Sequence, residues 1–251
     1  MKRTIVGPWR FIVGPDILPE IGLHAKWLGT RALFMGGNRA IESVRKPIET
    51  SLSDNGLDWH VEQGSHVDKV KSSVDALVTI GCEQECDFVI GCGGGRAMDC
   101  SKAVAREMDV PLIVVPTVAG TNAAATISSG IEQDDVGRRH WYRGPDVIFC
   151  DTRVIVAAGP RYLASGMGDV LPFGAGFRIR REMRMPGGAE SGALGLTGAF
   201  PTAAAEAIGG LTYPLIMEHG KRAYDDTAMG MPTDAVNRVC EAIYYCSAVG
   251  G

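Results

Sequence analysis

The sequence predicts an α/β protein in which a parallel sheet is followed by an all-helical part. Short apolar, β-branched runs alternate with helix-like segments as far as Asp151, which is the order of strands joined by crossover helices. The runs at 88–92 and 112–115 are apolar at consecutive positions, as strands covered on both faces are. Beyond Asp151 the recognisable segments are all helix-like. We therefore predict an α/β domain over 1–158 and a helical domain over 159–251.

Each predicted strand is a run bounded by glycine, proline or polar residues. The six runs are RFIVG (10–14), RALFMGG (31–37), LDWHVEQG (57–64), CDFVIGCGG (86–94), PLIVVPT (111–117) and PDVIFCDT (145–152). The helices predicted between them cover 17–29, 39–56, 66–85 and 95–109. In 39–56 the residues Ile41, Val44, Ile48 and Leu52 recur every three or four positions, which is helical spacing. Pro160 suits the first turn of a helix, and 201–226 and 232–251 continue the helical part.

Composition excludes several classes of protein. Of the 251 residues 45% are hydrophobic and 22% are charged, which is typical of a globular chain and excludes a mainly disordered one. The net charge of −4 lacks the basic stripe of a nucleic-acid binder. No apolar run is long enough to span a membrane, and the N-terminus lacks a signal-peptide core. Seven cysteines without paired C-x-x-C motifs indicate buried free thiols, so we expect a cytoplasmic protein.

Three consecutive glycines, Gly93, Gly94 and Gly95, end a predicted strand and open a predicted helix. Such a junction is either a simple turn or a cradle in which free backbone N–H groups meet an anion, with a pyrophosphate as the natural occupant. The G-x-G-x-x-G fingerprint is absent, so the glycines alone do not decide between the two.

A small, hydroxyl-rich segment, PTVAGTNAAATISSG (116–130), follows the next buried strand. Thr117, Thr121 and Asn122 would lie at the carboxyl end of the sheet, where open α/β sheets bind their ligands. The alternative is an irregular loop that caps a helix through Thr121 or Asn122. The two interpretations are compatible, because one loop can both cap a helix and contact a ligand.

Three blocks together resemble a known family. GGGRAMDCSKAVA (93–105), VPTVAGTNAAATISS (115–129) and PDVIFCDTRVIVAAGPRYLASGMGDVL (145–171) are similar, in order and spacing, to the glycerol dehydrogenase-like branch of the iron-containing alcohol dehydrogenase superfamily. The resemblance implies a Rossmann-like nucleotide-binding domain, then an all-helical domain, with the active site between them. It implies that Gly93 to Gly95 bind NAD or NADP, with Asp99, Thr117 and Thr121 nearby. Asn122 stands where glycerol dehydrogenases usually carry a substrate-facing aspartate.

The resemblance also implies a divalent metal, zinc or iron. Asp169, in SGMGD, matches the family's aspartate ligand, and the metal would polarise the substrate oxygen as a Lewis acid. Without the family, the same aspartate reads equally well as a helix-start carboxylate. The family's two histidine ligands follow the point where this sequence ends, so we expect an incomplete helical domain. None of the five histidines matches a ligand position; they are His24, His60, His66, His140 and His219.

Two arginine-containing segments bear on the cofactor and the substrate. Relatives that prefer NAD often carry an aspartate near the position of Gly36; here Gly36 and Gly37 leave room, and Arg39 could meet a 2′-phosphate. We therefore expect NADP to be accepted at least as well as NAD, the alternative being a solvated Arg39. The arginines of FRIRREMR (177–184) indicate a solvated helix face rather than a site for a phosphorylated substrate.

The leading functional prediction is a metal-dependent, NAD(P)-linked oxidoreductase that oxidises a small, glycerol-like polyol or secondary alcohol to the ketone. Asp169 and Asn122 are its candidate catalytic residues. The alternative is a truncated relative that holds nucleotide without turnover. A lyase of the dehydroquinate synthase type is disfavoured, because the 116–130 loop lacks the lysines and arginines needed for a highly charged substrate. We expect a small-molecule alcohol as partner, no nucleic acid or membrane, and a homo-oligomer.

Overall fold

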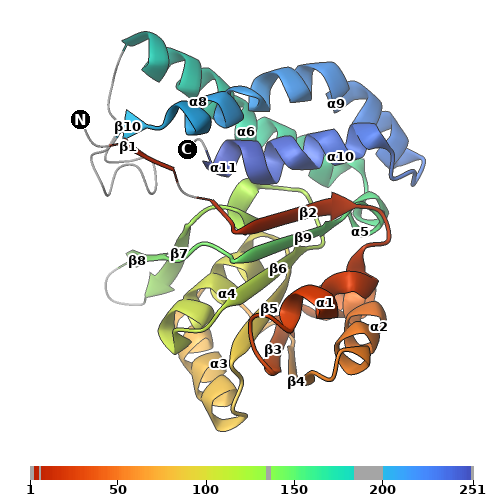
Figure 1. Cartoon of the computed structure of the whole chain (residues 1–251), viewed down its shortest axis with the longest axis vertical. Coiled ribbons are helices and arrows are strands. Elements are labelled where there is room, and N and C mark those ends of the chain that lie inside the picture. The colour runs from red at the N-terminus through yellow and green to blue at the C-terminus, as the bar shows by residue number, and fades with distance from the viewer. Residues whose placement is uncertain (1–2, 6, 134–136, 184–199, 250–251) are drawn as a thin grey trace.

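The computed structural model describes residues 3–5, 7–133, 137–183 and 200–249. Its centre is a six-stranded parallel sheet in the order β2-β9-β6-β5-β3-β4, and a layer of helices lies at one side of it (Figure 1). The strands are β2 (Arg10–Gly14), β3 (Arg31–Gly36), β4 (Asp58–Gln63), β5 (Phe88–Gly93), β6 (Leu112–Pro116) and β9 (Val147–Asp151). They coincide with the six predicted runs, so the predicted α/β class and parallel sheet are confirmed.

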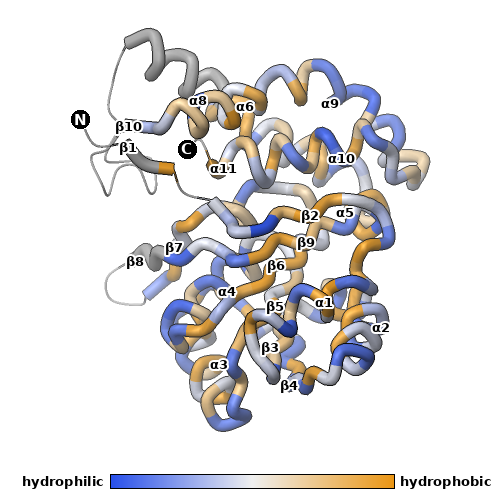
Figure 2. The backbone as a smooth tube through the Cα atoms, viewed as in Figure 1, coloured by the Kyte–Doolittle hydropathy of each residue, from blue (hydrophilic) through white to orange (hydrophobic). Residues whose placement is uncertain are grey.

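The helices that follow the strands cover both faces of the sheet. They are η1 (Leu18–Glu20), α1 (Ile21–Ala25), α2 (Asn38–Asp54), α3 (Lys71–Glu83), α4 (Gly95–Met108), η2 (Asn122–Ala124) and α5 (Thr152–Ala158). Side chains alternate along each strand between the two faces. In β3, Phe34 packs with the buried residues of α1 and α2, whereas Leu33 and Met35 pack with those of α3 and α4. The inner strands β3, β5, β6 and β9 are accordingly hydrophobic along most of their length, whereas the edge strand β4 is mostly polar (Figure 2).

The strand order reverses between β3 and β5. The chain runs outward from β3 to β4 and then returns, so that β5 pairs with β3 on the side away from β4. The helices after these two strands, α2 and α4, consequently pack on opposite faces. Their first turns diverge and leave a crevice at the carboxyl ends of the strands, which is where open α/β sheets bind ligands.

The helical layer begins with α6. Its elements are α6 (Pro160–Met183), α8 (Ala203–Gly210), α9 (Thr212–Ala228), α10 (Asp234–Glu241), the π-helical turn η3 (Ala242–Cys246) and α11 (Ser247–Val249). As predicted, Pro160 opens a helix. Among the described helices none is both long and apolar enough to cross a bilayer. The side chains of the arginine-rich segment 177–184 lie outside the described residues.

Two pairs of short strands correct the sequence-based prediction of secondary structure. The short strand β10 (Phe200–Pro201) pairs in parallel with β1 (Arg3–Thr4), so the segment after Asp151 is not purely helical. The antiparallel hairpin of β7 (Ser128–Gln133) and β8 (Gly137–Tyr142) occupies a stretch in which we predicted no strand. Both are two-stranded pairs outside the main sheet, so they lack the doubly buried apolar run that marks the four inner strands of that sheet.

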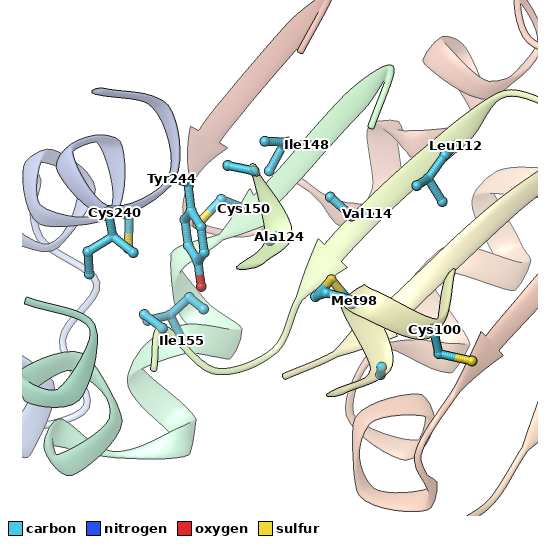
Figure 3. Packing of buried hydrophobic residues seen from close by; sticks show 14 of the residues in the cluster. Met98, Cys100, Leu112, Val114, Ala124, Ile148, Cys150, Ile155, Cys240 and Tyr244 are labelled. Carbon is cyan, nitrogen blue, oxygen red and sulfur yellow. The ribbon is translucent and has the colours of Figure 1, made fainter. Parts of the chain in front are cut away.

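Buried side chains join the helical layer to the sheet. The Tyr244 ring lies close to Cys150 of β9 and Cys240 of α10 (Figure 3). Its hydroxyl donates to the carbonyl oxygen of Val118 at 3.0 Å. All seven cysteines are free thiols and six of them are buried, as predicted; Cys82 is the exposed one.

Candidate active site

The glycine turn joins β5 to α4, with Gly93 buried and Gly94 and Gly95 partly exposed. Gly93 has φ +147°, a conformation that side chains disfavour, and a Cβ there would lie 2.8 Å from that of Ala97. A Cβ on Gly94 would lie 2.9 Å from Val118 Cγ2. Gly94 is the N-cap residue of α4 and has no side chain to bond the first N–H groups of the helix. The turn therefore needs glycine for its shape and leaves amide donors free for an anion.

A pocket of about 510 Å³ lies against this turn, at the crevice where the strand order reverses. Its walls come from the loops after three neighbouring strands, β3, β4 and β5. The lining residues are Gly37, Ala40, Gly64, Ser65, Val67, Asp68, Gly93, Gly94, Gly95, Arg96 and Ala97. Three of the predicted cofactor residues, Gly93 to Gly95, and a fourth, Gly37, are thus brought together in one cavity.

The two glycines after β3 have different roles. Gly36 is buried beside β5, and a Cβ there would come within 2.5 Å of the Cys92 carbonyl oxygen, so strand packing requires glycine. Gly37 lines the pocket, and its Cβ would meet nothing within 4 Å. Arg39 is exposed on the first turn of α2 and does not contribute to the pocket wall. Arg39 thus lies between Gly37 and Ala40, two residues of the pocket wall, with its own side chain in solvent.

The loop after β6 brings Thr121 and Asn122 to Asp169. The Thr121 hydroxyl donates to Asp169 Oδ2 at 3.1 Å, and the Asn122 backbone N–H donates to the same oxygen at 3.0 Å. Thr121 also caps η2 by accepting from the Ala123 N–H, so the capping alternative holds as well. The Asn122 side chain is buried and donates to Ser247 Oγ at 3.3 Å. Thr117 is buried, and its N–H donates to the Gly93 carbonyl oxygen at 3.0 Å.

A close helix–loop contact positions Asp169. In α6, a Cβ on Gly166 would come within 2.2 Å of the Ala119 carbonyl oxygen, so glycine allows the helix to touch the loop. Ser165 Oγ donates to the Gly120 carbonyl oxygen at 3.1 Å beside it. Asp169 follows one turn later on an exposed face. Gly166, the first glycine of SGMGD, thus allows the close helix–loop contact that places the Asp169 carboxylate beside Thr121.

Lys102 is a site residue that the sequence did not reveal. Its side chain is 0% exposed, and its ammonium donates to the carbonyl oxygens of Ala123 at 2.8 Å and Ser128 at 2.6 Å. It also contacts both oxygens of Thr126 at 3.2 Å and forms an ion pair with Asp99 Oδ1 at 3.0 Å. Burial lowers the pKa of Lys102, whereas the neighbouring Asp99 raises it. Asp99, a predicted cofactor residue, therefore serves here as the counter-ion of a lysine that holds the loop.

The described residues do not fit a complete divalent-metal site. Asp169 supplies one carboxylate, but this part of the chain holds no group of three histidine, cysteine or acidic side chains that could bind an ion. His24 contacts Arg10 Nη1 at 3.0 Å, and His60 and His66 both bond Glu62. His219 lies beside Glu218, and the side chain of His140 is outside the described residues. A tetrahedral zinc site needs about four ligands, so we derive no chemical step through a metal.

Comparison with known proteins identifies the family. Residues 8–152 match the family of iron-containing alcohol dehydrogenases. A glycerol dehydrogenase of Escherichia coli O6:H1 is 32% identical over 255 residues, covering 100% of this chain and 66% of the relative. A glycolaldehyde reductase of Halobacterium salinarum is 29% identical, covering 100% and 67%. The crystal structure of a probable glycerol dehydrogenase from Sinorhizobium meliloti 1021 has a TM-score of 0.84 at 24% identity, covering 99% of this chain and 66% of that one.

The architecture is a doubly wound parallel sheet with an appended helical layer, and its reversal point carries the glycine turn. The family match extends over more than half of the sequence, so this chain belongs to the iron-containing alcohol dehydrogenase family. Its curated relatives confirm the predicted glycerol dehydrogenase-like branch. The chain spans about two thirds of the length of these relatives.

Proposed function

We propose that this chain binds NAD or NADP and serves the oxidation of a small, glycerol-like polyol or secondary alcohol to the ketone. The pocket at the glycine turn is the observation that carries the proposal, because it joins uncapped helix amides to the point of strand reversal. Both features favour a diphosphate. Relatives named as glycerol dehydrogenases support the substrate class.

The residues of the chain divide between cofactor and substrate. Gly93, Gly94 and Gly95 would hold the diphosphate, with Thr117 and Thr121 as further contacts along the loop. The bound nicotinamide supplies the hydride acceptor. Thr121 and the Asn122 N–H hold the Asp169 carboxylate in place on the substrate side. We propose Asp169 as the residue of this chain that a divalent metal, zinc or iron, would use.

Acceptance of NADP remains part of the proposal. Gly37 lies in the pocket wall without a side chain, so no carboxylate at this position repels a 2′-phosphate. Arg39 is exposed two residues after Gly37, on the first turn of α2. Binding constants for the two cofactors, measured on the unaltered chain and on Arg39→Ala, test this point; an unchanged NADP affinity in the variant would exclude Arg39.

Gly37→Leu provides the direct test of the nucleotide site. Its Cβ has open space around it, so the variant should fold, while the rest of the side chain enters the pocket. We expect NAD and ADP-ribose to bind at least about tenfold more weakly by titration calorimetry, which corresponds to about 1.4 kcal/mol. Gly210→Leu, at an exposed glycine with equally open surroundings, is the matched control. Equal nucleotide affinity in Gly37→Leu and the control would refute the site.

A second candidate function is nucleotide binding without turnover. The observation in its favour is the single carboxylate at Asp169, with no metal-binding group among the described residues. Purified protein supplied with zinc or iron, glycerol or a propanediol, and NAD or NADP should accumulate reduced nicotinamide if the chain is a working dehydrogenase. Nucleotide binding with no such accumulation would select the second function.

A further inference from the structure

An ion pair crosses the wall of the glycine pocket. Arg96 is the second residue of α4, and Asp68 belongs to the loop after β4; both line the pocket. Arg96 Nε donates to Asp68 Oδ1 at 2.7 Å, and Nη2 bonds the other carboxylate oxygen. The carboxylate is thus held by both of its oxygens, the bidentate geometry that arginine also uses for phosphate.

The two partners differ in how firmly they are placed. The Asp68 side chain is 22% exposed, and its Oδ1 also accepts from the Lys69 N–H at 2.7 Å. The Arg96 side chain is 69% exposed, and no second bond of its guanidinium is seen in the described residues. Asp68 therefore has a second bond that holds it in place, whereas the exposed Arg96 side chain depends on Asp68 alone for its position. Arginine can exchange its partner here with no change in the backbone.

The charges of Asp68 and Arg96 have opposite effects on an anion that enters the pocket. The hydrogen bond from Arg96 lowers the pKa of Asp68, so the carboxylate is charged at neutral pH. Glu132 adds a further negative charge near Arg96, and Lys69 lies 3.4 Å from Glu132. A diphosphate entering the pocket meets repulsion from Asp68 and attraction from Arg96. As long as Arg96 is paired with Asp68, this attraction is largely cancelled.

We propose that Arg96 exchanges Asp68 for the diphosphate when nucleotide binds, so that Asp68 is a competitor that lowers nucleotide affinity. This inference rests on the proposed function, since it requires a diphosphate at the glycine turn. The exchange makes Arg96 the charged contact of the pocket and Asp68 the residue that sets how tightly the cofactor is held. The alternative is a purely structural pair that tethers the loop after β4 to α4.

Neutralising each partner separates the two possibilities. Asp68→Asn keeps an oxygen for the Lys69 N–H but removes the charge. We expect it to raise the affinity for NAD and ADP-ribose about two- to fivefold, the range for losing a competing exposed ion pair. Arg96→Gln should lower the affinity.

The control and the salt dependence complete the test. Asp75→Asn removes an equal charge from an exposed ion pair with Lys71 on α3, and should leave affinity unchanged. The gain in Asp68→Asn should shrink at high ionic strength, because exposed charges are screened. An affinity in Asp68→Asn equal to or below that of the unaltered chain would overturn the exchange, as would an unchanged affinity in Arg96→Gln. If the unaltered chain itself binds no NAD, the proposed function fails and this inference fails with it.

Discussion

Lys102 should be among the most costly side chains to remove from this protein. Its ammonium is fully buried and touches the Ala123 and Ser128 carbonyl oxygens, both oxygens of Thr126, and Asp99. Lys102→Met keeps most of the apolar stem but leaves these oxygens without their donor. Removing one partner of a buried ion pair costs about 3 to 5 kcal/mol, because the other charge remains buried and uncompensated. Each orphaned carbonyl adds to the cost, and methionine packing offsets part of it.

We therefore expect the free energy of unfolding of Lys102→Met to fall by about 3 to 5 kcal/mol. For a domain of this size that corresponds to a melting temperature lower by roughly 6 to 20 °C. Urea titration followed by circular dichroism measures the first quantity, and differential scanning calorimetry measures the second. Lys221→Met is the matched control, because Lys221 is 91% exposed and pairs with Asp225 at the surface. It should change stability by less than about 0.5 kcal/mol.

A second substitution guards against a misleading result. In Lys102→Met the Asp99 carboxylate, whose side chain is 20% exposed, loses its counter-ion, so adding Asp99→Asn should recover part of the lost stability. A loss below about 1 kcal/mol in Lys102→Met would refute the reasoning, because an exposed lysine costs no more than that. Recovery in the double variant, with a large loss in the single one, would support the buried pair.

Two further predictions concern the pH dependence of stability. Burial raises the pKa of the Cys100 thiol from its ordinary value of 9.0 to about 12. Between these values the unfolded chain releases a proton that the folded chain keeps, so stability falls as pH rises. Urea midpoints of Cys100→Ala should fall less steeply over this range, whereas Cys82→Ala, at the exposed thiol, should match the unaltered protein. Burial alone would raise the pKa of Asp87, but hydrogen bonds from the Arg31 N–H, the Thr30 N–H and the Thr30 hydroxyl lower it below 3.8. The contribution of Asp87 to folding stability is therefore present above that pH and is lost as the pH falls through the pKa of the folded state. Asp87→Asn should lose about 1 to 2 kcal/mol at pH 7 and much less at acid pH; an equal loss at both would contradict this.

The inner strands of the central sheet could be predicted from the sequence because they are buried on both faces. Burial on both faces forces consecutive apolar residues, as in Phe88 to Ile90, and the helices between them carry the helical period. The hairpin of β7 and β8 gave no such signal, because it lies outside the main sheet and its first strand is rich in small and polar residues. These residues form strands because β7 and β8 pair with each other, and a local sequence pattern does not reveal that pairing.

The candidate site could be predicted only in part, because some of its contacts join residues that are distant in the sequence. Gly93 to Gly95 stand out locally, because three consecutive glycines between a strand and a helix can be recognised in the sequence without knowledge of the fold. Lys102 with Asp99 three residues earlier reads as an ordinary surface pair on a helix; only the arrival of the 121–128 loop buries it. The pair of Arg96 and Asp68 joins residues 28 positions apart, so no local pattern could predict it.

The loop at 117–122 is fastened to both layers of the molecule. On the sheet side Thr117 bonds Gly93; on the helical side Tyr244 bonds Val118 and Asn122 bonds Ser247. A rotation of the helices relative to the sheet that keeps these hydrogen bonds would pivot at this loop, with the largest displacement far from it. The groups around Asp169 would keep their mutual spacing during such a hinge motion, while distant surfaces swing.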